Sequence, residues 1–401
     1  MKRIFILITA IALMLSGCSS DTPTDSAGGD AYIDVDKLKS EYNETLDEGT
    51  VDSLEIDDHA HVFCGLGYYL TVSQNQLLMS SQESKKVIDL SSGNITSFCD
   101  IPGCAHDVNT SEGCLEYELL NSMTYTKDGI YYTDYKKPGK LFYKSGSKTD
   151  VVFENTYYND KDKELEPGHE TGFVFFIRGD TMYIRSLTYF YTVDMKTMEQ
   201  TCEPVTLTDS PISNADTCGD YYYITNSNFE LIAYNMKTAT LKKYADKVLR
   251  IQACDDGLYY IKEGKSGLDI YFCDSDGENE VKLIEGVWPN MFVTDERIFY
   301  VKPDGLYVYD KKTKQSQQLE LSLKYQNGED YITQDFSLVT LFSCPSSDNI
   351  YFVDYALITG EKHMNALFVI NKATLKTRAI SLGIYDSSNG YFSGIGQIVT
   401  Y

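Results

Sequence analysis

The sequence is poor in basic residues and in tryptophan. Its 401 residues include 35 Lys and Arg against 59 Asp and Glu, which gives a formal net charge of −24. Such a chain lacks the positive charge that attracts phosphate backbones, so DNA and RNA are poor candidates as partners. One Trp and 9 Pro stand against 33 Tyr and 18 Phe, and 42% of the residues are hydrophobic. This composition excludes a wholly disordered chain and favours strands over helices.

Signatures of common enzyme families are also absent. The chain contains no Gly-x-Ser-x-Gly, no His-Glu-x-x-His, no phosphate-binding glycine loop and no dinucleotide fingerprint. No catalytic residue is therefore assigned, and the ligand-binding residues stay unknown. A pair of glycosidase carboxylates remains an alternative, because separation in space and not sequence defines such a pair.

The first 17 residues have the pattern of an export signal. Lys2 and Arg3 precede an apolar run over residues 4–14, which is shorter than the roughly 20 residues of a membrane-spanning helix. The run ends in Leu-Ser-Gly-Cys, which resembles the bacterial lipobox. That resemblance implies removal of residues 1–17 and acylation of Cys18, with an ordinary cleaved signal as the alternative. We therefore expect a lipid anchor on the extracytoplasmic face of the bacterial cell membrane, because no later apolar stretch reaches spanning length.

A short phrase recurs through most of the chain: a turn residue, an apolar residue and then an aromatic pair, as in Asp256-Gly257-Leu258-Tyr259-Tyr260. Its copies are anchored at Leu78, Tyr131, Tyr183, Tyr223, Tyr259, Phe299 and Tyr351. Their mean spacing is roughly 45 residues, which is the length of a four-stranded propeller blade. We expect one aromatic residue of each pair to be buried between blades.

A second phrase follows the first in most copies. An apolar strand ends on Asp or Asn and is followed by a Lys/Thr turn, at Asp194, Asn235, Asp310 and Asn371. Asp and Asn at such positions bond to the backbone two residues further on, as hairpin turns require. Two phrases in register indicate repeated β-hairpins.

These repeats predict an all-β fold, a β-propeller of seven four-stranded blades, with six or eight as alternatives. Either residues 390–399 or the segment 61–72 could supply a strand to the first blade. The two segments cannot occupy the same strand position. The predicted organisation is a signal peptide at 1–17, a flexible tether at 18–31, a lead-in at 32–60 and the propeller at 61–401.

A family resemblance supports this prediction. The segment from Ile270-Tyr271-Phe272-Cys273-Asp274 to Asn279, the strand at Leu283 and the later Arg297-Ile298-Phe299-Tyr300 are similar to propeller domains of low-density lipoprotein receptor and TolB type. The chain resembles in particular the uncharacterised bacterial lipoproteins that carry such repeats, over about residues 60 to 400. The resemblance implies fold and cell-surface location. It implies no activity, because these families share none.

Cysteine and histidine gather in one loop. Cys99, Cys104, His106 and Cys114 form Cys-x4-Cys-x-His-x7-Cys, a donor set that suits a closed tetrahedral zinc site. The spacing departs from the usual two to four residues between paired zinc ligands, and disulfides are permitted in exported proteins. We favour a disulfide framework, and zinc is the alternative. The same Cys/Pro/Cys/His segment recurs in the lipoproteins that the chain resembles.

Three other features have competing interpretations. Cys218 and Cys254 hold equivalent places in consecutive repeats, but we do not favour a bridge between them because neighbouring sheets can exceed disulfide distance. The acidic run 274–280 resembles a calcium loop, although a hairpin turn explains it better. Among aromatic residues, those in loops, Tyr157, Tyr158 and Tyr325, are the better candidates for recognition.

The sequence predicts a lipid-anchored propeller that binds a protein or glycan partner outside the membrane. Two alternatives remain open at this point. The first is a polysaccharide hydrolase or lyase with carboxylates at the central channel, and the second is a metal or redox role for the Cys99–Cys114 loop.

Overall fold

The computed structural model describes the chain from residue 68 to residue 393 with gaps. The described residues are 68–73, 76–80, 85–89, 95–97, 99, 104, 120–126, 129–134, 137–146, 148–165, 172–265, 267–319, 323–324, 330–331, 341, 348–359, 362–386 and 391–393. The predicted signal peptide, tether and lead-in lie outside these residues and stay predictions. Within the described part the chain is all-β apart from one short helix, which confirms the predicted fold class.

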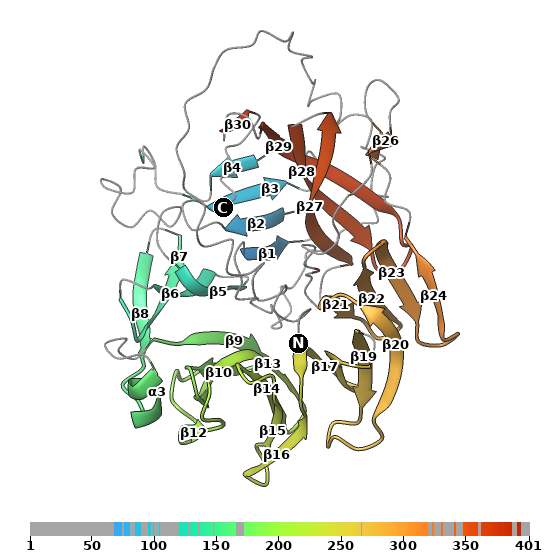
Figure 1. The fold of residues 1–401 in the computed structure, drawn as a ribbon. Coiled ribbons are helices and arrows are strands. Elements are labelled where there is room, and N and C mark those ends of the chain that lie inside the picture. Colours follow the sequence, from blue (N-terminus) through green and yellow to red (C-terminus); the bar gives the residue numbers. More distant parts are fainter. Residues whose placement is uncertain are drawn as a thin grey trace.

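Seven antiparallel sheets of four strands account for most of the described residues. In each sheet the strands follow one another in chain order. Figure 1 shows the sheets, which we number 1 to 7 along the chain, succeeding one another around a common centre. Four-stranded meanders in this arrangement are like the blades of a propeller.

The strands have the following bounds. Sheet 1 contains β1 (Tyr68–Ser73), β2 (Gln76–Ser80), β3 (Lys85–Asp89) and β4 (Ile95–Ser97); sheet 2 contains β5 (Leu120–Thr126), β6 (Gly129–Asp134), β7 (Lys140–Ser145) and β8 (Lys148–Glu154). Sheet 3 contains β9 (Val174–Arg178), β10 (Thr181–Arg185), β11 (Tyr189–Asp194) and β12 (Val205–Thr206); sheet 4 contains β13 (Ile212–Cys218), β14 (Tyr221–Asn226), β15 (Leu231–Asn235) and β16 (Thr240–Ala245). Sheet 5 contains β17 (Val248–Cys254), β18 (Gly257–Glu263), β19 (Leu268–Cys273) and β20 (Val281–Val287); sheet 6 contains β21 (Met291–Val293), β22 (Arg297–Lys302), β23 (Gly305–Asp310) and β24 (Gln315–Gln318). Sheet 7 contains β27 (Asn349–Thr359), β28 (Lys362–Asn371), β29 (Thr377–Asp386) and β30 (Tyr391–Ser393), and a small hairpin of β25 (Leu323–Lys324) and β26 (Asp330–Tyr331) precedes it.

The aromatic pairs lie on the second strand of sheets 2, 4, 5 and 6, and both members are buried in sheets 4, 5 and 6. Tyr222 and Tyr223 are each 0% exposed, and Tyr259 and Tyr260 are 3% and 1% exposed. The prediction that one of each pair is buried therefore holds in sheet 2, where Tyr132 is buried and Tyr131 is half-buried, but it is wrong for sheets 4, 5 and 6. Successive side chains point to opposite faces of a strand, and here both faces are covered by neighbouring sheets. The ring of Tyr222 stacks on Phe190 of sheet 3 at 4.2 Å, whereas Tyr223 packs in a cluster that includes residues of sheet 5.

Side chains on the innermost strands join one sheet to the next. Asp216 of β13 accepts a hydrogen bond from the backbone N–H of Ala253 on β17 at 2.8 Å. Gln252, at the equivalent position of β17, bonds both the N–H and the carbonyl of Val293 on β21, each at 2.8 Å. Asp216 is 6% exposed, so these bonds satisfy polar groups that water does not reach. The same contact therefore recurs at two consecutive junctions.

The second sequence phrase forms the turn between the third and fourth strands of sheets 3, 4 and 6, and the turn between the second and third strands of sheet 7. Asp194 Oδ1 accepts hydrogen bonds from the backbone N–H groups of Lys196 and Thr197 at 2.8 and 2.9 Å. Asn235 and Asn371 do the same with the residues two and three positions further on, and Asp310 accepts from Thr313. Each turn then places its fifth residue in the left-handed conformation: Met198, Ala239, Lys314 and Leu375. Four sheets thus share one turn geometry.

Sheet 7 is offset by one strand relative to the others. Its first strand, β27, carries the aromatic phrase that elsewhere marks a second strand, and the Asn371 turn joins β28 to β29. Residues 391–393 form β30, which pairs with β29 at the open outer edge, so the suggestion that this segment enters the first sheet is wrong for these residues. Tyr68–Ser73 takes that place as β1. No sheet of the described part combines strands from both ends of the chain.

The single tryptophan lies at the junction of sheets 5 and 6. Trp288 follows β20, and its backbone N–H donates to the carbonyl of Val301 on β22 at 2.7 Å. Its indole Nε1 is buried without a hydrogen-bond acceptor. The residue as a whole is half-buried, so its indole nitrogen faces inward at this junction while part of the residue reaches solvent.

Candidate functional site

The predicted cysteine and histidine site is only partly within the described residues. Cys99 and Cys104 are half-buried, whereas His106, Cys114 and the lipid-bearing Cys18 lie outside the described part. Among the described residues no group of three or more His, Cys, Asp or Glu side chains is arranged to hold a metal ion. The zinc and disulfide alternatives for this loop both stay predictions.

The thiols of the central sheets serve as packing. Cys218 and Cys254 are not bridged; the Cys218 thiol donates to the carbonyl of Cys254 at 3.0 Å. Burial raises the pKa of both thiols, and it raises the pKa of Cys273 to about 12. Thiols held protonated in this way are poor nucleophiles. Cys273 is buried, Cys202 is half-buried, and Cys344 lies outside the described residues.

The acidic run 274–280 is the hairpin turn between β19 and β20. The carbonyl of Ser275 accepts hydrogen bonds from the hydroxyls of Tyr223 and Tyr244 at 2.7 and 2.9 Å, which fixes the turn against sheet 4. Glu278 pairs with Lys242 at 2.9 Å and Glu280 pairs with Lys262 at 2.7 Å. Lysines thus neutralise the carboxylates that a calcium ion would require.

Buried carboxylates in the described part are dispersed. The buried ones are Asp134, Asp162, Asp216 and Asp269, and they come from β6, α3, β13 and β19. Asp216 bonds backbone N–H groups, and Asp269 accepts from the N–H of Gly286 at 3.2 Å. These dispersed residues therefore offer no pair of channel carboxylates for the hydrolase alternative.

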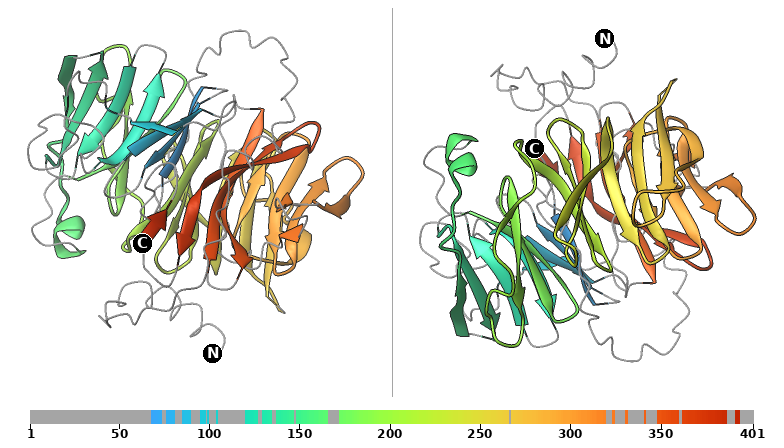
Figure 2. Two further views of the ribbon diagram at one scale, coloured as in Figure 1. Left: turned by 90° about the horizontal axis from the view of Figure 1, so that it is seen from above. Right: turned by 90° about the horizontal axis from the view of Figure 1, so that it is seen from below.

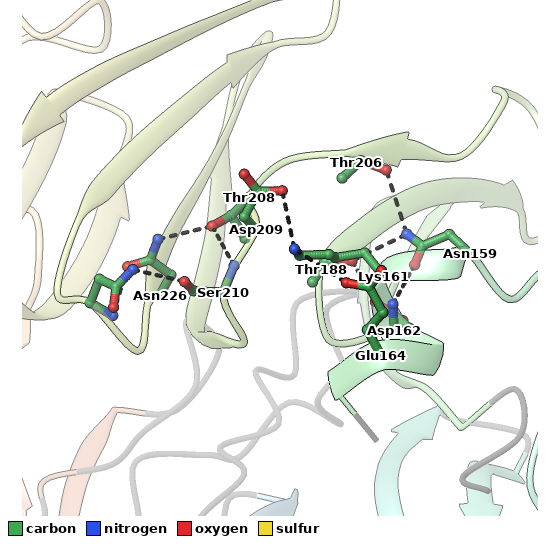
Figure 3. A network of polar contacts seen from close by, with 11 residues as sticks. Asn159, Lys161, Asp162, Glu164, Thr188, Thr206, Thr208, Asp209, Ser210 and Asn226 are labelled. Carbon is green, nitrogen blue, oxygen red and sulfur yellow. Dashed lines mark hydrogen bonds and ion pairs between the residues drawn. The ribbon is translucent and has the colours of Figure 1, made fainter. Parts of the chain in front are cut away.

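A polar surface extends over sheets 3 and 4, on the side where each second strand turns into the third and each fourth strand leads to the next sheet. It includes the helix α3 (Asp160–Leu165), which lies beyond the ends of β5–β8 in Figure 2. Figure 3 shows the hydrogen bonds and ion pairs that its residues and their neighbours make. We define the polar surface by Asn159, Lys161, Thr206, Thr208, Asp209, Ser210, Asn228 and Phe229.

The helix end of the polar surface is anchored by buried polar groups. Asn159 Oδ1 accepts from the backbone N–H of Asp162 at 2.7 Å and so caps the helix. Asp162 is 0% exposed and accepts a hydrogen bond from the hydroxyl of Thr188. The amide of Asn159 reaches both Thr188 at 3.1 Å and Thr206 at 3.5 Å. Sheet 3 thus holds the short helix in place through side chains.

A buried amide and tyrosines fix the segment that leads into α3. Asn155 donates to the hydroxyl of Tyr189 at 3.1 Å and accepts from the hydroxyl of Tyr191 at 2.9 Å. The hydroxyl of Tyr189 in turn donates to the carbonyl of Tyr157 at 2.9 Å. Burial raises the pKa of Tyr189 to about 12, so this network stays protonated at neutral pH.

The other end of the polar surface is the turn between β14 and β15. Asn226 is 0% exposed, and its Oδ1 accepts from the N–H groups of Asn228 and Glu230 at 3.1 and 3.0 Å. Its amide donates to Thr208 at 2.9 Å and to Glu230 at 2.8 Å. Every polar group of the Asn226 side chain is therefore occupied in shaping this turn.

Phe229 stands at the tip of that turn. Its side chain is 49% exposed, and its φ of 61° lies in the left-handed region, which a bulky residue adopts only under constraint. The constraint is visible: its N–H donates to the carbonyl of Asn226 at 2.9 Å, and its carbonyl accepts from Val248 at 2.8 Å. The fold thus holds an aromatic ring in solvent against the local preference of its backbone.

The charges around Phe229 are mixed but acidic on balance. Asp209 is strongly exposed and lies 4.0 Å from the ammonium of Lys161. A hydrogen bond from Lys243, and a second from Asn226, lower the pKa of Glu230, so Glu230 is ionised at neutral pH. Exposed Asn228 donates to Ser210 at 2.7 Å. Amides, hydroxyls and carboxylates therefore surround the ring.

Sequence reasoning did not single out this surface. The aromatic residues that it favoured behave differently: Tyr157 is half-buried and packs edge-on against Tyr189 at 4.7 Å, Tyr158 is half-buried, and Tyr325 lies outside the described residues. The local string Asn226-Ser-Asn-Phe-Glu230 did carry a signal, an aromatic residue inside a polar turn. Its exposure depends on contacts with sheets 3 and 5 that sequence does not reveal.

Comparisons with known proteins identify no family. No protein-family model and no curated protein matches the chain. Solved structures of similar shape include an oligogalacturonate lyase in complex with manganese, with TM-score 0.45, 12% identity and coverage of 74% of this chain and 86% of that one. Others are the Neurospora crassa Pan2 WD40 domain (0.45, 8%, 75% and 86%) and the computationally designed Ika8 protein (0.43, 10%, 82% and 95%). Likenesses this distant say nothing about activity.

Proposed function

We propose that the protein is a lipid-anchored binding module whose polar surface recognises a protein or glycan partner outside the bacterial cell membrane. The single observation that carries the proposal is Phe229, an exposed aromatic residue held in a left-handed turn by a saturated asparagine. Strained backbone that the surroundings enforce tends to mark functional positions. An aromatic anchor fixed in advance loses little conformational freedom on binding.

The anchoring half of the proposal rests on the lipobox-like residues 15–18 and on the polar segment that follows them. A chain acylated at Cys18 and tethered through residues 18–31 holds its folded part close to the membrane. Two attachment signals normally give stable anchoring, so a single processed cysteine must carry more than one acyl chain. None of the described helices is long and apolar enough to cross a bilayer.

Seven sheets in a closed ring provide the platform. Arg297 of sheet 6 donates to the carbonyls of Lys372 and Ala373 in sheet 7, and clusters of buried side chains join sheets 2 to 6 in turn. Direct packing of sheet 7 on sheet 1 completes the proposed ring of seven blades. A closed ring fixes the loops at either end rigidly, which suits recognition by a preformed surface.

Photo-crosslinking on intact cells tests the binding function. A benzophenone-bearing residue replaces Asn228 on the polar surface and, as a matched control, Leu241, which is 48% exposed on the outer strand β16. We expect adducts of higher mass at position 228 and few at position 241. Equal adduct yields at the two positions would contradict the proposed function.

Two measurements test the features near the N-terminus. We expect labelled fatty acid to be incorporated into the full chain and to be lost in Cys18→Ala; labelling of the variant would contradict the anchor. For the Cys99–Cys114 loop we propose a disulfide framework, with less than one metal ion per chain by elemental analysis. Stoichiometric zinc that disappears in Cys104→Ser would show that this loop is a metal site instead.

A further inference from the structure

We infer that the polar surface binds a neutral carbohydrate chain, with one sugar ring lying against the exposed face of Phe229. This inference rests on the proposed binding function and names its ligand class. Sugars present hydroxyl groups around their edge and C–H groups on their face. A ligand of this kind requires an apolar plane beside several small hydrogen-bonding groups, and the polar surface supplies both.

Phe229 provides the plane. Among the described side chains the strongly exposed large hydrophobic residues are Val151, Leu165, Phe229, Leu241 and Val281, and Phe229 alone is aromatic. Val151, Leu241 and Val281 lie on the outer strands β8, β16 and β20, where sheet edges face solvent. Leu165 ends the short helix α3, so Phe229 is the one exposed residue of this set that stands at the tip of a turn between strands. Its flat ring offers contact area with only two side-chain rotations to restrict.

The neighbours of Phe229 provide the hydrogen-bonding groups. Ser210 accepts from Asn228, and its hydroxyl proton remains able to donate to a ligand. Asn228 and Asp209 are exposed and contribute acceptor oxygens, whereas Thr208 is held by Asn226. Amide and hydroxyl side chains donate hydrogen bonds to sugar hydroxyls and accept hydrogen bonds from them, and carboxylates accept them. A surface for an extended apolar partner would need larger hydrophobic groups than these.

The local charge favours neutral sugars over acidic ones. Asp209 and Glu230 flank the turn, and the lysines close to them, Lys161 and Lys243, are already engaged in ion pairs. The chain as a whole has a net charge of −24. An anionic polysaccharide would meet like charge both at the surface and at long range. A neutral glycan meets neither penalty.

The turn is also prepared for a ligand in advance. Asn226 uses its oxygen and its amide to fix the backbone from Asn228 to Glu230, and Val248 of sheet 5 holds the carbonyl of Phe229. Carbohydrate binding gains little from each contact, so a surface that must reorganise would bind sugars weakly. Here the ring and its polar neighbours already have their positions.

Affinity electrophoresis of the full chain tests this inference. The gels contain hydroxyethylcellulose, xylan, mannan or glycogen as neutral probes and polygalacturonate as the acidic probe. We expect at least one neutral polysaccharide to retard the protein and polygalacturonate to have no effect. Phe229→Gly should weaken that retardation at least tenfold, in proportion to the loss of about 1.5 kcal/mol from an aromatic contact. Phe229→Trp should retain it.

Glycine variants separate binding from folding. Glycine adopts positive φ without strain, so Phe229→Gly should fold and melt at a temperature no lower than that of the wild type. Ala239→Gly is the matched control: Ala239 has a φ of 53° in an exposed turn on the opposite side of the ring. We expect Ala239→Gly to leave retardation unchanged.

Three outcomes would overturn the inference: no retardation by any neutral probe, stronger retardation by polygalacturonate, or equal retardation of Phe229→Gly and wild type. The crosslinking experiment then decides the wider proposal separately. Protease-sensitive adducts at position 228 would support the binding function but show that the partner is a protein and not a glycan. Equal adduct yields at positions 228 and 241 would contradict both the binding function and the glycan as its ligand.

Discussion

The loops at the two ends of the sheets differ in how they are built. On one side the turns that carry the second sequence phrase repeat a single design, with an Asp or Asn acceptor and a left-handed fifth residue in sheets 3, 4, 6 and 7. On the other side sheets 3 and 4 carry α3 and the Phe229 turn, and each occurs once in the described residues. Repetition indicates what folding requires. A feature that departs from the repeat and is also strained needs another explanation, and recognition supplies it.

The largest expected loss of stability comes from the non-repeated side. Asn155→Ala removes the acceptor of Tyr191 and the donor to Tyr189, both of which are buried. We expect the free energy of unfolding to fall by about 2 to 3 kcal/mol, measured by urea denaturation. Asn228→Ala, in an exposed position of the same surface, should change it by less than about 0.5 kcal/mol. Similar effects of the two variants would mean that α3 is not anchored by this network.

The equivalent hydrogen bonds at the two junctions should contribute similarly to stability, so removing either should have a similar effect. Asp216→Ala and Gln252→Ala each remove the side chain that bonds the next innermost strand, leaving the N–H of Ala253 or of Val293 without its acceptor. We expect each variant to lose about 1 to 2 kcal/mol in the same denaturation measurement. A loss confined to one of them would break the equivalence of the two junctions.

The repeated turns should gain stability from glycine. Lys314 and Leu375 have φ values of 58° and 61° in equivalent turns of sheets 6 and 7. Lys314→Gly and Leu375→Gly should each raise the free energy of unfolding by about 1 kcal/mol, because relief of the left-handed strain exceeds the added flexibility of the unfolded chain. Calorimetry should show similar rises in melting temperature. Destabilisation by either change would show that its side chain contributes packing that outweighs the strain.

The smallest expected effect depends on pH. Hydrogen bonds from backbone N–H groups lower the pKa of Asp194 in the folded protein, so its contribution is present above the ordinary pKa of about 4 and is lost as pH falls through the folded value. Asp194→Asn keeps the acceptor, as Asn235 does in sheet 4, and should flatten the decline of melting temperature between about pH 5 and pH 3. Asn235→Asp should steepen it. Parallel profiles for all three proteins would contradict this assignment.

Sequence predicted the repeated side well and the other side poorly, for a physical reason. The Asp194 and Asn371 turns follow from bonds between residues two or three positions apart, which a local pattern records. The recurrence of the aromatic pairs is visible in the sequence, but the full burial of both members depends on neighbouring sheets on both faces. The exposure of Phe229 follows from Val248 and Thr208, which belong to other repeats, so no local pattern encodes it.

The position of Trp288 at the junction of sheets 5 and 6 has a practical consequence. Because the whole chain contains one indole, fluorescence excited selectively from tryptophan originates from this junction alone. Tyrosine emission and circular dichroism average over every sheet. If the ring opens as one cooperative unit, the three signals coincide during denaturation; if the sheets separate in sequence, the indole signal departs from the others. The protein thus contains its own optical reporter of how tightly the sheets are coupled.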